Sequence, residues 1–172
     1  MHWLIDQTAE AEKAAKIIRS AGGEVIGRTR LQKLAYLLEI TGLGQGLSFE
    51  YRHYRPYSEQ LTNATMFGRL NGLLQEEERA ASWGGSYSIF RTSDACESSS
   101  PEARSLISAA VNANPIDLEL AATAAFLARE GHSDAWAETA RRKPEKAGRL
   151  ESAKALYRTL LQNQYPNPLP TI

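Results

Sequence analysis

The chain has 172 residues, a length that suits one domain or one domain with a helical extension. Hydrophobic residues make up 42% of it and charged residues 23%, which is typical of a globular protein and excludes global disorder. Twenty basic and twenty acidic residues balance to zero. The whole chain therefore lacks the basic excess of proteins that bind nucleic acid mainly through phosphates.

The cysteine content and the hydropathy of the sequence limit the cellular locations that we expect for the protein. Cys96 is the single cysteine, so no internal disulfide can form. No apolar run approaches the roughly 18 residues needed to span a bilayer. Residues 1–20 alternate alanine with charge and lack the apolar centre of a signal peptide. We expect a cytoplasmic protein without a membrane partner.

Two helices are predicted near the N-terminus. Residues 8–21 repeat alanine and isoleucine at helical spacing, and residues 29–41 form the clearest helix of the chain. Thr29 and Gln32 match a T-x-x-Q capping box, in which each side chain satisfies a free backbone donor. The apolar stripe of the second helix is Leu31, Leu34, Ala35 and Leu38.

A strand, a third helix and a hairpin are predicted next. Residues 47–54 alternate as a half-buried strand with His53 on the buried face, and Pro56 is expected to end the pairing. Ser58 can cap a helix that runs to about residue 75, with Glu76 to Glu78 as its solvated end. A turn at Gly84-Gly85 then predicts a β-hairpin with Trp83, Tyr87 and Ile89 as strand-type side chains.

The remaining chain is predicted to be helical. Ser100 and Asn114 each precede a proline, as at a capped helix start. Ser133 is expected to cap a shorter helix that stops before Pro144, and a final amphipathic helix follows. The fold class is thus mainly α with a small β-hairpin or sheet.

The order helix, helix, strand, helix, hairpin predicts a winged-helix-like N-terminal part, followed by a helical C-terminal part. We expect residues 1–92 to form the winged-helix-like region and 93–100 a linker. Residues 101–163 are then a helical extension packed on it within one domain, and 164–172 an extended tail.

Patterns for catalysis, metals and cofactors are weak throughout. The glycine-rich segment 42–46 follows a helix instead of opening one, so it lacks the geometry of a phosphate loop. None of the three histidines has a second ligand at metal-binding spacing. Cys96 has no base nearby in sequence. We expect no cofactor, no metal and no enzyme, although a site built from distant residues stays an open alternative.

Basic and aromatic groups are the stronger candidates for binding. One basic cluster comprises Arg28, Arg30, Lys33, Arg52 and Arg55, and a second comprises Arg141, Arg142, Lys143, Lys146 and Arg149. Each could contact phosphate or could simply form a solvated face. Tyr51, Tyr54, Tyr57 and Trp83 could stack on bases, form a protein-binding hot spot or fill the core. We favour the core for Tyr51.

Two segments resemble the Panacea / SocA-type antitoxin-domain family. Residues 27–37, GRTRLQKLAYL, are similar to its G-x-T-x-L-Q-K-L-x-Y segment. Residues 54–61, YRPYSEQL, are similar to its Y-G-P-Y-S-x-x-L segment, with Arg55 in place of the family's glycine. The match covers about residues 10–92. It implies a non-enzymatic antitoxin or adaptor that binds and neutralises a toxin, in the setting of phage defence.

These observations divide the motif residues into two groups. Fold-specifying positions are Thr29, Leu31, Gln32, Leu34, Tyr36, Pro56, Ser58 and Leu61. Candidate contacts to protein or DNA are Arg28, Arg30, Lys33, Arg52, Tyr54, Arg55 and Tyr57. Lys33 and Arg55 rank first because they have no evident local role. We expect a non-catalytic module that sequesters a partner protein and forms weak homo-oligomer contacts. The alternative is a winged-helix DNA-binding transcriptional regulator.

Overall fold

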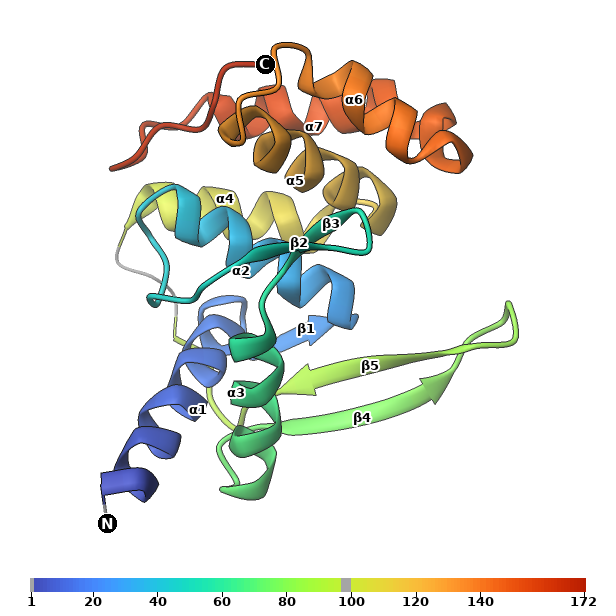
Figure 1. Cartoon of the computed structure of the whole chain (residues 1–172). Coiled ribbons are helices and arrows are strands. Elements are labelled where there is room, and N and C mark those ends of the chain that lie inside the picture. The colour runs from blue at the N-terminus through green and yellow to red at the C-terminus, as the bar shows by residue number, and fades with distance from the viewer. Residues whose placement is uncertain (1, 97–99) are drawn as a thin grey trace.

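The computed structural model describes residues 2–96 and 100–172, and it is mainly helical with a small antiparallel sheet. At the N-terminal end, α1 (His2–Ser20) and α3 (Glu59–Leu70) lie side by side (Figure 1). The alanines of α1 allow this close approach, since Ala11, Ala14 and Ala15 are fully buried. Ser58 caps α3 as predicted, because its Oγ accepts from the backbone N–H of Leu61 at 3.1 Å.

A three-stranded sheet has the order β1-β5-β4, from β1 (Glu24–Ile26), β4 (Gln75–Ala80) and β5 (Ser86–Arg91). The predicted hairpin forms from β4 and β5, which project from the body (Figure 1), but its turn spans residues 81–85 instead of Gly84-Gly85 alone, and Trp83 lies in that turn and not in a strand. Two expectations were wrong. Glu76 to Glu78 belong to β4 and not to a helix end, and α3 stops at Leu70. The glutamates form a strand because they pair with β5, whose Ile89 and Phe90 are buried.

A second hairpin replaces the single strand predicted over 47–54. It consists of β2 (Glu50–Arg52) and β3 (Arg55–Tyr57), joined by His53 and Tyr54 at positive φ. His53 is exposed, so its predicted burial was wrong. Pro56 also does not end the pairing, since it lies opposite Tyr51. A two-stranded ribbon tolerates proline because a strand edge can leave its N–H position unpaired.

The central helix is α2 (Arg28–Ile40), which contacts α4 and α5. Its apolar side chains lie in the core, with Leu34 and Leu37 fully buried. The predicted capping box is wrong: α2 starts after Gly27, and no side chain in the described part of the chain caps it. Gln32 cannot complete the box because its amide bonds to Ser58 of another element.

The C-terminal part consists of α4 (Pro101–Asn112), α5 (Pro115–Arg129), α6 (Ala135–Arg142), the 3-10 helix η1 (Pro144–Arg149) and α7 (Leu150–Leu161). Ser100 and Asn114 cap α4 and α5 as predicted. Asp134, one residue after the predicted Ser133, caps α6.

The chain after α7 has no regular structure but is packed. Tyr165 and Leu169 are buried, and Tyr157 donates from its hydroxyl to the carbonyl of Pro170 at 2.5 Å. One cluster of buried side chains runs from α1 through α2 to α7 and this tail. The predicted linker 93–100 includes residues 97–99, which lie outside the described residues. No helix within 2–96 and 100–172 is long and apolar enough to cross a membrane.

Candidate binding site around the two sequence motifs

The two motif segments meet through Gln32 of α2 and the backbone of Ser58. The Gln32 amide nitrogen donates to the Ser58 carbonyl at 2.9 Å, and the Ser58 N–H donates to the Gln32 amide oxygen at 2.8 Å. Both groups are buried. Gln32 also donates to the hydroxyl of Thr62 at 3.2 Å. One side chain therefore fixes the start of α3 against α2.

We call the place where β3 and the start of α3 meet α2 the α2–α3 corner. Lys33 is its buried cation. Its residue is 1% exposed, and Nζ donates to the carbonyl of Pro56. Burial, followed by the positive charge of Arg55, lowers the pKa of Lys33 to about 7. A protonated ammonium has three donors, and the Pro56 carbonyl is the only acceptor found for it within the described residues. Lys33 thus joins α2 to β3 while its charge stays poorly compensated.

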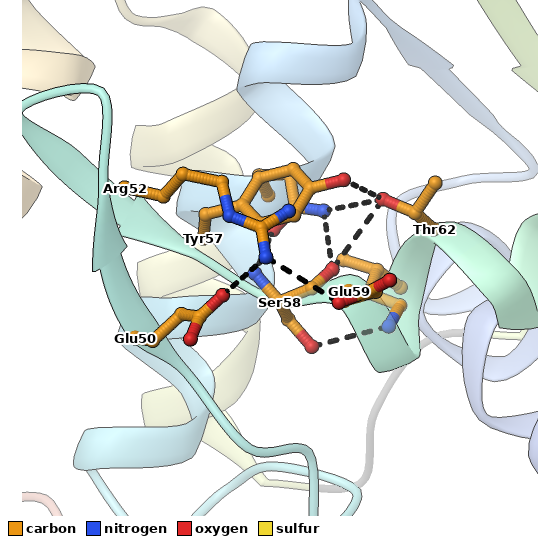
Figure 2. Close-up of polar contacts among 8 residues, drawn as sticks. Glu50, Arg52, Tyr57, Ser58, Glu59 and Thr62 are labelled. Atoms are coloured by element: carbon orange, nitrogen blue, oxygen red, sulfur yellow. Dashed lines mark hydrogen bonds and ion pairs between the residues drawn. The ribbon is translucent and has the colours of Figure 1, made fainter.

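Arg52 and Tyr57 lie on the outer side of the same corner (Figure 2). The Arg52 guanidinium stacks over the Tyr57 ring at 4.8 Å and pairs with Glu50 at 2.6 Å. It also approaches Glu59 at 3.4 Å. The Tyr57 and Thr62 hydroxyls are hydrogen-bonded at 2.7 Å. Both predicted contact residues are therefore held in place by neighbours, and the charge of Arg52 is balanced.

A cleft of about 380 Å³ lies between α2 and α3, and both motifs contribute to its wall. We call it the motif pocket. Its polar and charged lining includes Arg28, Thr29, Gln32, Lys33, Arg55, Tyr57, Thr62, Arg69 and Glu76. The structure brings together four of the predicted contact residues here, namely Arg28, Lys33, Arg55 and Tyr57. Arg69 and Glu76 were missed because they come from α3 and β4, outside both motifs.

Charge in the motif pocket is strongly unbalanced. Glu76 binds Arg69 at 2.6 Å and Arg28 at 3.2 Å. Burial would raise the pKa of Glu76, but its hydrogen bonds and charge interactions with the two arginines lower it. The side chain of Arg55 makes no hydrogen bond or ion pair with any residue that the structure describes. Among the described residues, the pocket lining thus carries the cationic side chains of Arg28, Lys33, Arg55 and Arg69 and the single carboxylate of Glu76.

Arg30 lies away from this pocket. It donates to the carbonyls of Ile26 at 3.1 Å, Ala110 at 2.8 Å and Ala113 at 2.7 Å. Two of these acceptors lie at the C-terminal end of α4, where helix carbonyls lack partners within the helix. Burial lowers the pKa of Arg30. The structure therefore gives this candidate contact a role in joining α2 to α4.

The tyrosines of the second hairpin differ in exposure. Tyr54 is 60% exposed at the turn. Tyr51 is half-buried and packs on the core, as favoured from the sequence, with its ring stacked on Phe126 at 5.4 Å. The guanidinium of Arg142 also lies over the Tyr51 ring, 5.1 Å from its centre. Tyr54 is thus the available aromatic contact of this hairpin.

A second cleft, of about 600 Å³, lies between the β4–β5 hairpin and the start of α2. Trp83 at the hairpin loop is 75% exposed, and Ile26 of β1 is 48% exposed. Tyr87 and Pro115 also line this cleft. We call it the hairpin cleft. Ile26 was missed because β1 has three residues, too few for an alternating pattern to be recognised.

Each of the five cations in the second basic cluster is bound to one of three carboxylates. Lys143 and Lys146 both bind Glu119, and Arg149 binds Asp117 at 2.6 Å. Arg141 and Arg142 both bind Glu138 at 2.5 Å. These carboxylates were not associated with the cluster from the sequence because two of them come from α5. The cluster consequently offers little free positive charge.

Comparison with known proteins adds no assignment: no protein-family model matches the chain, and no curated protein is significantly similar to it. The features that bear on function are the motif pocket, the hairpin cleft and the distribution of charge.

Proposed function

We propose that the chain is a non-catalytic module that captures a partner protein through the hairpin cleft and the adjacent start of α2. The observation that carries this proposal is the exposure of Trp83 and Ile26 in one concave surface. Large apolar side chains gathered at a cleft mark protein interaction sites, and tryptophan is enriched among binding hot spots. Arg28, which borders both clefts, adds a charged contact at the rim.

The resemblance to the Panacea / SocA-type family indicates which class of protein the partner belongs to. That family implies an antitoxin or an adaptor, so the captured protein is a cognate toxin. The two resembling segments form the α2–α3 corner, where Gln32 and Lys33 hold the second segment against the first. In this proposal the motifs mainly hold the corner, and the exposed side chains around it select the partner.

The distribution of charge supports a protein partner over nucleic acid. Helix α3 contains one acidic and one basic residue, Glu59 and Arg69, and Arg69 is bound to Glu76. Strand β4 contains three glutamates and one arginine. DNA-binding surfaces require unpaired positive charge near the phosphates. Neither α3 nor β4 supplies it.

The order of elements favours a second candidate, a winged-helix DNA-binding regulator. Apart from the β2–β3 hairpin inserted between α2 and α3, the elements α1, β1, α2, α3 and β4–β5 come in the order of that arrangement. The sheet order β1-β5-β4 is compatible with it. In that case α3 would enter the major groove and the hairpin would act as the wing. The acidic hairpin makes this the weaker candidate.

The experiment is capture of the partner by the tagged full chain from its native host, with nuclease present, at low and moderate salt. We expect one stoichiometric protein that survives both treatments. Trp83→Ser should reduce its recovery at least about tenfold, as expected for a hot-spot tryptophan. Leu161→Ser, which alters a 38% exposed leucine on α7, should leave recovery unchanged. Recovery of nucleic acid alone, lost as salt rises, would instead establish the DNA-binding candidate.

The toxin assignment has its own test. The captured protein is expressed in a heterologous bacterium with and without the chain. We expect growth arrest from the partner alone and growth with the pair, and Trp83→Ser should restore arrest. A partner that is harmless when expressed alone would refute the toxin class while leaving protein capture intact.

A further inference from the structure

We propose that the motif pocket is a binding site for a small doubly charged oxyanion of the phosphate type, either inorganic or as a phosphate ester. This site lies on the opposite side of Arg28 and Thr29 from the hairpin cleft, and these two residues border both. The inference goes beyond capture of a protein partner and does not depend on it.

The guanidinium of Arg55 is the first group that we expect to bind the anion. The side chain of Arg55 lines the pocket and lacks any hydrogen-bond or ion-pair partner within residues 2–96 and 100–172. The guanidinium presents five N–H donors in a fork that matches phosphate oxygens. Other arginines of the chain that line the pocket, Arg28 and Arg69, are already held by Glu76. The Arg55 guanidinium is therefore available to an incoming anion.

The ammonium of Lys33 is the second group that we expect to bind the anion. This ammonium is buried and poorly compensated, with the Pro56 carbonyl as its acceptor. The charged groups that act on it are Arg55 of β3, Glu119 of α5, Lys143 after α6 and Lys146 of η1. Glu119 is occupied by the two lysines. An anion placed between Lys33 and Arg55 would offset charge that the protein itself leaves uncompensated.

The size and remaining lining of the pocket fit a small ligand. A volume of about 380 Å³ is within the range of small-molecule sites. The hydroxyl of Thr29 supplies a neutral donor beside the cations, whereas the hydroxyls of Thr62 and Thr65 bond to Tyr57 and to the Thr62 carbonyl. The apolar side chains of Leu61 and Met66 line the same space, which leaves room for an organic group attached to the oxyanion.

The test is titration calorimetry of the purified full chain at constant ionic strength, with inorganic phosphate, pyrophosphate and adenosine diphosphate as probes. We expect saturable binding of one equivalent of at least one probe. Binding of phosphate or pyrophosphate identifies an inorganic ligand, and binding of the nucleotide alone identifies an ester. Absence of saturable binding by all three would overturn the proposal.

Variants locate the site. Arg55→Gln should weaken binding by about tenfold or more, as expected for loss of a charge-assisted contact. Arg158→Gln removes an exposed arginine of α7 that has no partner in the described chain, and should leave binding unchanged. Equal effects of the two variants would refute the site. Arg55→Gln breaks no observed contact, so the fold should persist, as circular dichroism would verify.

The dependence on pH tests Lys33 separately. Sulfate serves as the probe because it does not titrate between pH 6 and 9. We expect its affinity to fall by about tenfold across this range, since Lys33 loses its proton there in the free protein. Lys33→Met should remove this dependence. A wild-type affinity that is constant with pH would exclude Lys33 from the site.

Discussion

Glu119 of α5 accepts a hydrogen bond from Lys143 at 2.7 Å, and both side chains are almost fully buried, at 6% and 5% exposure. Lys146 binds the other carboxylate oxygen at the same distance. Burial would raise the pKa of Glu119, but the two lysines lower it below its usual value. This ion cluster fixes the end of α6 and η1 on α5.

Breaking that cluster should strongly destabilise the fold. Glu119→Gln leaves a buried ammonium without a counter-ion, and we expect the free energy of unfolding to fall by about 3–5 kcal/mol at pH 7. The control is Glu151→Gln, which breaks an exposed pair with Lys154 and should change little. Denaturant unfolding measures both. Similar losses in the two variants would contradict the structural role of Glu119.

The pair of Glu119 and Lys143 also predicts how the free energy of unfolding changes at acidic pH. A carboxyl whose pKa is lower in the folded than in the unfolded chain stabilises the fold above its unfolded pKa, and this contribution is lost as pH falls through the folded pKa. The difference in unfolding free energy between wild type and Glu119→Gln should therefore shrink below about pH 4. A difference that is constant from pH 7 to pH 3 would be inconsistent with an ionised Glu119.

Gln32 predicts a second loss of stability. Gln32→Leu preserves the apolar volume but leaves the buried N–H of Ser58 unpaired, while the Ser58 carbonyl keeps the N–H of Thr62 as a donor at 3.3 Å. We expect a loss of about 1–3 kcal/mol, the usual cost of one buried donor left unsatisfied. Gln164→Leu, at an exposed position of the tail, is the matched control. Unchanged stability of Gln32→Leu would show that water replaces the lost partner.

The elements that could be predicted from the sequence are those specified locally. The caps at Ser58, Ser100 and Asn114 depend on a few adjacent residues, and all three are confirmed. Strand β4 could not be predicted because Gln75–Ala80 contains no apolar alternation. Its conformation comes from pairing with β5, which lies beyond a loop.

The candidate site was predicted only in part for a similar reason. The motifs indicated Lys33 and Arg55 as unexplained residues, but the acceptor of Lys33 is 23 residues away in sequence. Arg30 appeared equally available, yet its main acceptors at Ala110 and Ala113 are 80 and 83 residues away. Such contacts follow from tertiary packing, which no local pattern records.

Lys33 also predicts how stability depends on alkaline pH in the absence of ligand. Its pKa is about 7 in the folded chain and has a usual value of 10.5. Between these values the unfolded chain holds more protons, so stability should rise with pH. We expect wild type to gain stability relative to Lys33→Met between pH 7 and 9.5. Lys154→Met alters an exposed ion pair, and its stability should change with pH in parallel with that of wild type. A wild-type curve parallel to Lys33→Met would show that Lys33 does not titrate in this window.

The turn of the second hairpin predicts opposite effects on stability and on binding. His53 and Tyr54 have φ values of 53° and 61°, in the left-handed region that side chains other than glycine and asparagine adopt at a cost. A two-residue turn of this kind favours Asn-Gly. We therefore expect the double variant His53→Asn, Tyr54→Gly to raise the free energy of unfolding by about 1 kcal/mol.

The same variant should weaken capture of the partner if the β2–β3 turn belongs to the binding face, because it removes the exposed ring of Tyr54 from that turn. Strained backbone of this kind persists where the side chains serve another purpose. The control is Tyr54→Phe, which keeps the ring and the strain and should match wild type in both measurements. A double variant that is more stable and still captures the partner at wild-type level would remove Tyr54 from the binding face and leave the hairpin cleft to carry it.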